Sequence, residues 1–374
     1  MQKSLLLLVC LLGINLLQGC FNKTFAQSDT TTQIKNYKPF RFTALPFLSF
    51  TPESSLQIGG IGTFVIQTKD TLNRSKYYRP INISPILIYT LNNQMIFITE
   101  ADVWFGKGWN SYTYFRFFLY PDFFYGLGSD TRAEDVERYG NDFVRATGRL
   151  VKSIDADNKL FAGLSYDLQY DNIFGLKQGG LLQQLNPLGV KGGFLDGVGA
   201  TVRYDSRNNT LYPTKGFQIS VDALRFGTVG NYNFNNLLID IRQYISIGSY
   251  KNVFAYQVFG NFTYNDEIPF YKLPRLGGVN LMRGIIENRF RDRQSAFLQA
   301  EYRRVIGRFG LAAFTGVGVV APSIDQFSSD NFKYIGGLGF RFSVFRDERL
   351  NIRLDYGMGT GGQSGIYLAF REAF

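Results

Sequence analysis

The sequence predicts an all-β protein, a transmembrane antiparallel β-barrel of sixteen strands. Three observations carry this prediction: apolar and polar residues alternate along many segments, the mean hydropathy is only -0.09 although 45% of the residues are hydrophobic, and the chain closes on an aromatic-rich segment. Alternation keeps the average polar, because each strand of a membrane barrel turns one face to lipid and the other to water. Beyond residue 20, no window has the roughly 18 consecutive apolar residues that a membrane helix needs. A soluble array of β-sandwiches is the alternative.

Residues 1–26 have the layout of a secretory signal peptide. Lys3 precedes the apolar run Leu5 to Leu17, which is too short to span a membrane, and small and polar residues follow it. We expect cleavage after Ala26. The alternative is a lipoprotein signal over residues 1–19, with Cys20 lipidated.

The domain organisation follows from this signal. Residues 27–38 form a periplasmic lead segment, and residues 39–374 form the barrel, which an exported chain would place in a bacterial outer membrane. Cleavage after Ala26 would remove Cys10 and Cys20 and leave no thiol chemistry.

The formal net charge of +10 comes from scattered rather than clustered basic residues. This pattern does not predict a nucleic-acid partner. Lysine and arginine side chains are expected to line a polar lumen, because charge facing lipid is costly. Outer-membrane lipids are the partners that a barrel implies. Attraction of the basic residues to anionic lipid head groups is a second, weaker explanation of the positive net charge.

Strand positions follow from the alternation. In Leu350 to Tyr356 every second residue is apolar and the intervening ones are charged or amide, and residues 217–222 and 337–344 repeat this pattern. Polar stretches near residues 128–141, 175–195 and 265–294 are expected to be external loops. A barrel with both ends in the periplasm needs an even number of strands, so the segment Pro39 to Phe50 is added as the sixteenth. The other strands are expected to begin near residues 56, 80, 95, 110, 142, 160, 197, 216, 234, 252, 296, 309, 334, 349 and 365.

Two blocks of residues are more specific than a generic barrel. The first reads Leu-Gly-Gly-Val-Asn-Leu-Met-Arg-Gly over residues 276–284, followed by Phe-Arg-Asp at 290–292 and Ala-Glu-Tyr-Arg at 300–303; the second is Asp-Ser-Arg-Asn at 205–208 with Pro213 and Gly216. Together they resemble the BamA/TamA-type superfamily, also called the bacterial surface antigen family. The resemblance implies a sixteen-stranded barrel with a long loop around Arg283 folded into the lumen. Five expected strands follow this loop, as in that superfamily.

The same resemblance supplies the candidate site. It implies a tether of the lumen loop through Met282, Arg283, Gly284 and Glu301, supported by Gly277, Gly278, Phe314 and Gly318. A guanidinium carries five fixed donors and stays charged, so it can bind inward-facing carboxylates. Glu301 faces inward because Leu298 and Tyr302 take the lipid face.

One position departs from the family pattern. The family places an aspartate two residues after the phenylalanine that corresponds to Phe314, where this chain has Gly316. We therefore expect Glu301 to be the main partner of Arg283. The alternative is that Arg283 is an ordinary solvated loop residue.

The C-terminal residues resemble the assembly signal of outer-membrane barrels. The signal positions are Gly365, Leu368, Phe370 and the terminal Phe374. Aromatic residues at this place are expected to anchor the last strand at the lipid head groups.

Function is expected from the resemblance, which implies an assembly or export factor for proteins or lipids. The barrel assembly machinery and periplasmic proteins are its implied partners, and the barrel itself is expected to be a monomer. Only about a dozen residues lie between the signal and the first strand, so we expect no POTRA domain. Glycines at 59, 60 and 62 either weaken a seam beside the first strand or mark bends of the barrel. A passive pore, surface antigen or adhesin is the alternative function.

Enzyme chemistry is not expected. The chain has no histidine, which removes Ser-His and Cys-His nucleophiles and His-ligated metal sites. The acid pair Asp325 and Asp330 is expected to be solvated. No cofactor and no metal are predicted.

Overall fold

The computed structural model describes residues 40–52, 54–66, 81–210, 212–265, 267–345 and 350–374. The predicted signal peptide, Cys20 and the lead segment 27–38 lie outside these residues. The described chain belongs to one compact unit that spans Pro39–Phe374.

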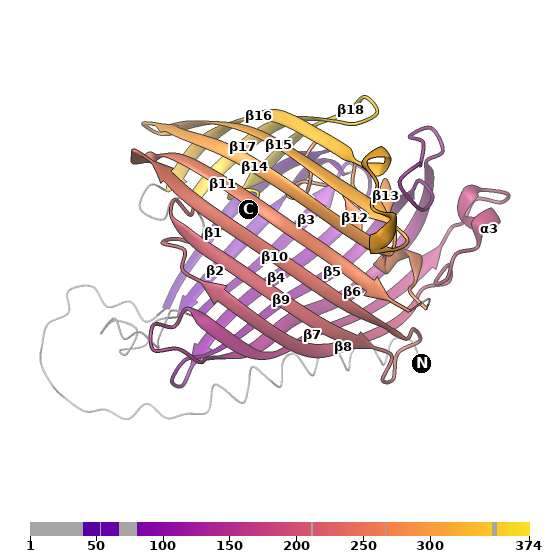
Figure 1. Ribbon diagram of the computed structural model, residues 1–374, viewed down its shortest axis with the longest axis horizontal. Coiled ribbons are helices and arrows are strands. Elements are labelled where there is room, and N and C mark those ends of the chain that lie inside the picture. The colour runs from indigo at the N-terminus through magenta and orange to yellow at the C-terminus, as the bar shows by residue number, and fades with distance from the viewer. Residues whose placement is uncertain (1–39, 53, 67–80, 211, 266, 346–349) are drawn as a thin grey trace, which may run out of the picture. The chain divides into compact units, whose positions relative to one another are not determined.

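Sixteen antiparallel strands close into one barrel, in which neighbours along the chain are neighbours in space and β1 meets β18 (Figure 1). The strands are β1 (Phe40–Thr51), β2 (Ser55–Ile66), β3 (Ile81–Thr90), β4 (Met95–Phe105), β5 (Trp109–Phe124), β6 (Glu137–Ser153), β7 (Leu160–Phe174), β8 (Gly193–Asp205), β9 (Gly216–Phe226), β10 (Phe234–Ile247), β11 (Ser249–Tyr264), β14 (Gln294–Ile306), β15 (Phe309–Ala321), β16 (Lys333–Phe345), β17 (Leu350–Gly359) and β18 (Gln363–Phe370). The prediction of sixteen strands is confirmed, and the added segment Pro39 to Phe50 corresponds to β1.

Short elements lie in the connections. The longest connection, between β11 and β14, carries η1 (Phe270–Lys272) and a separate two-stranded sheet of β12 (Arg275–Leu276) and β13 (Phe290–Arg291). The other short helices are α3 (Leu181–Leu185), η2 (Ile324–Gln326) and η3 (Ser329–Asn331). Among the described residues, no helix is long and apolar enough to cross a membrane.

The expected loop at residues 128–141 is partly wrong, because β6 already begins at Glu137. Side chains alternate there as in any strand: Glu137, Tyr139 and Asn141 are buried while Arg138 is exposed. These residues are polar on both faces, so hydropathy does not mark them as a strand.

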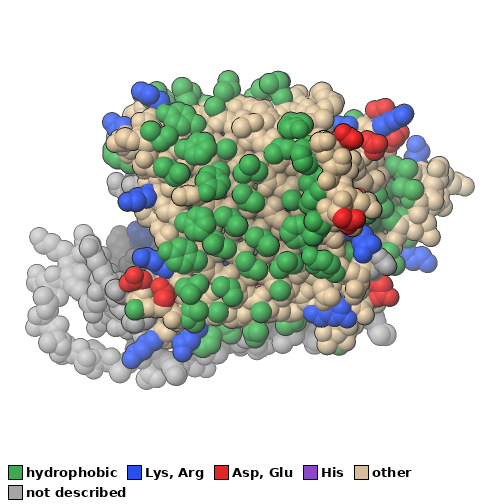
Figure 2. All heavy atoms as spheres, viewed as in Figure 1, with side chains coloured by type: hydrophobic (Ala, Val, Ile, Leu, Met, Phe, Trp, Pro, Cys, Tyr) green, Lys and Arg blue, Asp and Glu red, His purple; other side chains and the backbone are tan. Residues whose placement is uncertain are grey.

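Strands near the C-terminus turn an apolar face outward and a polar face inward, while the inner faces of β2 to β4 also carry isoleucines such as Ile61, Ile88 and Ile96. On β17, Leu354, Tyr356 and Met358 are about half exposed, whereas Arg353 and Asp355 have no exposed surface. Figure 2 shows the outer face as a broad field of hydrophobic side chains over the strands, with charged side chains gathered near the two ends. An apolar band with charge restricted to its rims matches the surface that a lipid bilayer requires.

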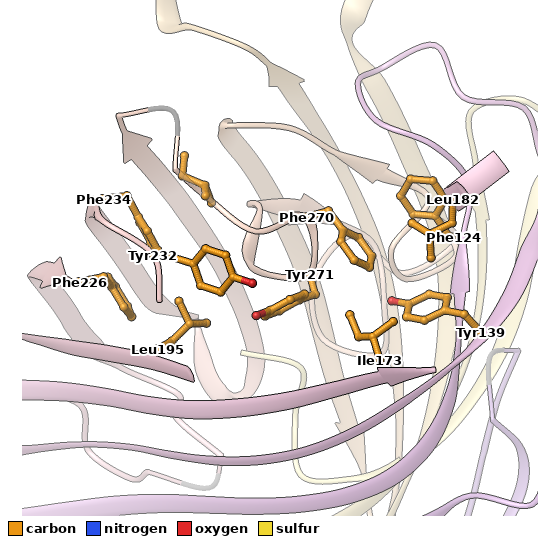
Figure 3. Close-up of a cluster of buried hydrophobic side chains, with 11 residues drawn as sticks. Phe124, Tyr139, Ile173, Leu182, Leu195, Phe226, Tyr232, Phe234, Phe270 and Tyr271 are labelled. Atoms are coloured by element: carbon orange, nitrogen blue, oxygen red, sulfur yellow. The ribbon is translucent and has the colours of Figure 1, made fainter. Parts of the chain in front are cut away.

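A hydrophobic cluster packs part of the long connection against the barrel strands. Phe270 and Tyr271 of η1 lie among aromatic and aliphatic side chains from the ends of β5 to β10 (Figure 3). Phe270 meets Phe124 edge-on at 5.4 Å between ring centroids, an arrangement that aromatic pairs favour. This contact holds the connection at one point, and the segment that carries Arg283 lies further along it.

Candidate functional site: a buried arginine network

The candidate site is centred on the turn at residues 277–286. The backbone N–H of Gly278 donates to the carbonyl of Ile285, and the N–H of Ile285 donates to the carbonyl of Met282, both at 3.1 Å. Met282 and Gly284 have positive φ of 54° and 112°. Most residues avoid such backbone conformations, so this turn is tight and specific. It presents the side chain of Arg283 at its tip.

Arg283 has no exposed surface and binds two carboxylates from two strands. Its Nη1 lies 2.5 Å from Oδ2 of Asp355 on β17, and its Nη2 donates to Glu301 on β14. Its guanidinium carbon lies 3.8 Å from the ring centroid of Phe314, within the range of a cation-π contact. Both carboxylates belong to the strand faces that point away from the exposed apolar side chains.

The two carboxylates are shared with other arginines. Glu301 also accepts from Nε of Arg303 at 2.7 Å and from Arg341 at 3.2 Å. Asp355 accepts from Arg341 at 2.5 Å and from Arg353 at 2.7 Å. Such a network compensates the cost of burying charge only while every member is present.

Arg353 also holds the turn directly. Its Nη2 donates to the backbone carbonyl of Val279 at 2.7 Å and to the side chain of Asn280 at 2.6 Å. Bonds from both Arg283 and Arg353 therefore connect the turn to β17.

The expectation of Glu301 as the main partner is wrong, because Arg283 binds Asp355 as closely as it binds Glu301. The position of the missing family aspartate, Gly316, is crowded: a Cβ there would lie 2.9 Å from the carbonyl oxygen of Leu298. The second carboxylate comes from β17 instead. Alternation had already placed Asp355 on the inner face, between Leu354 and Tyr356, but nothing in the sequence linked it to Arg283.

The glycines expected to support the motif allow close backbone contact. At Gly284 a Cβ would lie 2.6 Å from the backbone of Met358, and the Gly284 N–H donates to the hydroxyl of Tyr367 at 3.0 Å. At Gly277 a Cβ would lie 2.6 Å from the carbonyl of Ile286, and Gly278 also has a positive φ, of 108°. Gly318 lies beneath Leu276, where a Cβ would approach that side chain to 3.0 Å.

The C-terminal residues divide into a strand and a tail. Gly365 and Leu368 lie in β18, and Phe370 ends it in register with Ile352. The side chain of Phe370 is outside the described part of the structure. Leu368 pairs with Phe50 of β1 and so takes part in closing the barrel.

Phe374 does not lie at the lipid interface, so that expectation is wrong. Arg371 has a φ of 65° and turns the chain out of β18. Phe374 is only 4% exposed and packs in a cluster with Tyr244, Val253 and Ala255, while Nη2 of Arg303 donates to its carbonyl oxygen at 2.9 Å.

Glu372 draws this tail inward. Its carboxylate lies 2.9 Å from Nε of Arg341 and 3.7 Å from Nε of Arg303. It thereby joins the network around Arg283. The turn and the tail are thus connected through Glu301 and Asp355, which bind Arg283 of the turn and also Arg303 and Arg341, the arginines that hold the tail.

A cavity of about 700 Å³ is bounded by both segments. Gly277 to Leu281 of the turn and Arg371 to Phe374 of the tail line it, together with inward side chains of β1 to β7. Among the described residues, no group of three Cys, Asp or Glu side chains is arranged to hold a metal ion.

The Omp85 superfamily domain matches residues 89–365. BamA from Haemophilus ducreyi lacking POTRA domains 1-3 aligns with a TM-score of 0.59 at 10% identity, over 90% of this chain and 71% of that one. At this identity the likeness shows the fold alone. No curated protein matches the chain at significant similarity.

Two CdiB structures are similarly related. CdiB from Acinetobacter baumannii has a TM-score of 0.58 at 12% identity, and CdiB from Escherichia coli has 0.55 at 11%. The alignments cover 89% and 91% of this chain but only 60% and 63% of those two proteins.

Proposed function

The chain belongs to the Omp85 superfamily, and from this premise we propose that it is an outer-membrane barrel that inserts or exports proteins or lipids through the seam between β1 and β18. Its direct partners are outer-membrane lipids, with the barrel assembly machinery and periplasmic proteins as substrate suppliers. The role is not enzymatic, in keeping with a chain that has no histidine.

The observation that carries this proposal is the thin closure of the barrel. Within the described strands, β1 and β18 share one paired position, Phe50 with Leu368. The next interface, between β1 and β2, is paired at every position from Phe40 to Thr51. Backbone hydrogen bonds are the main links between strands, so the interface with the fewest pairs opens most easily.

The glycines of β2 do not cause this weakness. Gly59, Gly60 and Gly62 all lie opposite β1 residues in the fully paired interface. A Cβ at Gly59 would lie 2.0 Å from the carbonyl oxygen of Leu87 on β3. Gly59 therefore permits close approach of two backbones. This favours the alternative that the glycine marks a bend of the barrel.

Two segments bonded to the inner face of the barrel also favour the proposal over a passive pore. The turn around Arg283 and the tail that ends at Phe374 are both bonded to inward-facing side chains. A segment held in this way obstructs free diffusion through the barrel. Transport along the lumen would first require breaking the buried ion pairs.

Depletion of the protein tests the proposal. Quantification of the outer-membrane proteome after depletion should show loss of other barrels or of exported proteins, and lipid analysis should show whether lipids are the substrate instead. An unchanged proteome and lipid composition together with altered solute permeability would support a passive pore. No change in any of these would fit a surface antigen or adhesin.

A further inference from the structure

Two arginines face each other inside the barrel, away from the network around Arg283. Arg116 of β5 and Arg145 of β6 are direct partners in the antiparallel register, and both line the cavity. Like charges directly opposite each other on one face of a sheet repel. A folded protein keeps such a pair where something of opposite charge offsets it.

The carboxylate of Asp167, beside this pair, already binds two cationic groups. Asp167 of β7 accepts from Nε and Nη2 of Arg145 at 2.8 and 2.6 Å. Nζ of Lys272 lies 2.6 Å from the same carboxylate. Arg145 and Lys272 therefore share one carboxylate, and Arg116 lies beside them without an acid of its own.

Of the cations Arg116, Arg145 and Lys272, Arg116 lacks an ion-pair partner among the described residues. Among the described residues it makes no hydrogen bond and no ion pair, and its Nε is buried without an acceptor. Its guanidinium carbon lies 5.1 Å from the ring centroid of Tyr114. A buried guanidinium N–H without an acceptor is costly, and an anion beside it would remove that cost.

The other acids that line the cavity bind elsewhere. Glu100 pairs with Arg371, Glu287 with Arg275, and Glu372 with Arg341. Two aspartates remain. Asp122 accepts from Tyr139 and Asn288, and Asp171 accepts from Gln169.

We propose that the cavity binds a doubly charged oxyanion of the phosphate or sulfate type between Arg116 and Arg145. Guanidinium groups match the oxygens of such an anion in bidentate geometry, and Arg116 contributes a positive charge that no acid among the described residues pairs with. The cavity, at about 700 Å³, has room for the anion and several waters. Arg116 is the principal anion ligand, because Arg145 is already committed to Asp167.

Inorganic phosphate is the probe for the test. The full chain, folded in detergent micelles, is titrated with phosphate by calorimetry against a chloride background of equal ionic strength, which removes general screening. Wild-type protein should bind one phosphate. Arg116→Gln should weaken binding at least about tenfold, the effect of losing a charged hydrogen bond.

Arg149→Gln is the matched control. Arg149 lies on the same face of β6 as Arg145 and also has no ion pair among the described residues, but it packs on the ring of Tyr112 and does not line the cavity. This variant should bind phosphate as wild type does. The proposal is overturned if wild-type protein shows no phosphate binding, or if Arg116→Gln binds as tightly as Arg149→Gln. Since the wild-type result alone can overturn it, the test does not depend on the folding of a variant.

Discussion

The guanidinium of Arg283 lies 2.5 Å from the carboxylate of Asp355, a residue 72 positions further along the chain. With Glu301 on the other side, this contact places one buried arginine between β14 and β17. Three other arginines depend on the same two carboxylates, so the turn around Arg283 and the wall of the barrel stabilise each other.

Replacing Arg283 should therefore destabilise the whole barrel. Arg283→Ala leaves Glu301 and Asp355 without a cation that they share, and breaking a buried pair costs about 3–5 kcal/mol. The free energy of unfolding, measured by urea titration of the folded barrel in micelles, should fall by that amount, and heat-modifiability on gels should weaken. Arg275→Ala in the same connection is the control, because its pair with Glu287 is more than one-third exposed; such pairs contribute at most about 1 kcal/mol. Equal effects of the two substitutions would show that Arg283 is an ordinary loop residue.

A methyl group at Gly284 should have a similar consequence through the backbone. Gly284→Ala combines a φ of 112° with a Cβ placed 2.6 Å from the backbone of Met358. Backbone strain of this kind costs about 1–3 kcal/mol, and the turn must also move away from β17. Gly336→Ala is the control, since its nearest neighbour would lie 3.9 Å away at an ordinary φ. Urea midpoints should separate the two variants, and a midpoint for Gly284→Ala equal to that for Gly336→Ala would contradict the close approach.

Phe374 can contribute to the stability of the folded barrel, and it can also act as a signal for assembly in the cell; folding in vitro separates these two roles. Phe374→Ala should lower the stability of protein folded in vitro into lipid vesicles by about 3 kcal/mol, because a buried phenylalanine leaves a cavity. Phe374→Leu should cost less, since it keeps most of the apolar volume. No assembly machinery is present in vesicles. Unchanged stability of Phe374→Ala would therefore mean that this residue acts only as a signal read in the cell.

Much of the barrel could be predicted because its strands obey a local rule. Alternation depends on neighbouring residues, so β17 could be located from Leu350 to Tyr356, and counting strands to an even number located β1. The start of β6 was missed because Glu137 and Arg138 extend the strand beyond the apolar band, where both faces are polar.

The site was only half predictable, because its geometry is not local. The resemblance to a family pointed to Arg283 and Glu301, but Asp355 reaches Arg283 from a strand 72 residues away. The family pattern pointed to residue 316, where the carbonyl of Leu298 leaves no room for a side chain. Phe374 was assigned to the lipid interface because the sequence does not show that Arg371 turns the chain and that Glu372 binds Arg341 inside.

Locking the seam tests the proposed function most directly. Phe50 and Leu368 are cross-strand partners, and such pairs have Cα atoms about 4.5–5.5 Å apart, within the range of a disulfide. In cells depleted of the native protein, Phe50→Cys combined with Leu368→Cys should fail to restore the outer-membrane proteome under oxidising conditions and should restore it when reductant is added. The matched control is Leu311→Cys with Phe340→Cys, an outward-facing pair between β15 and β16. It should restore the proteome in both conditions. Full restoration by the oxidised Phe50–Leu368 variant, with the disulfide shown to have formed, would contradict a function that depends on opening between β1 and β18.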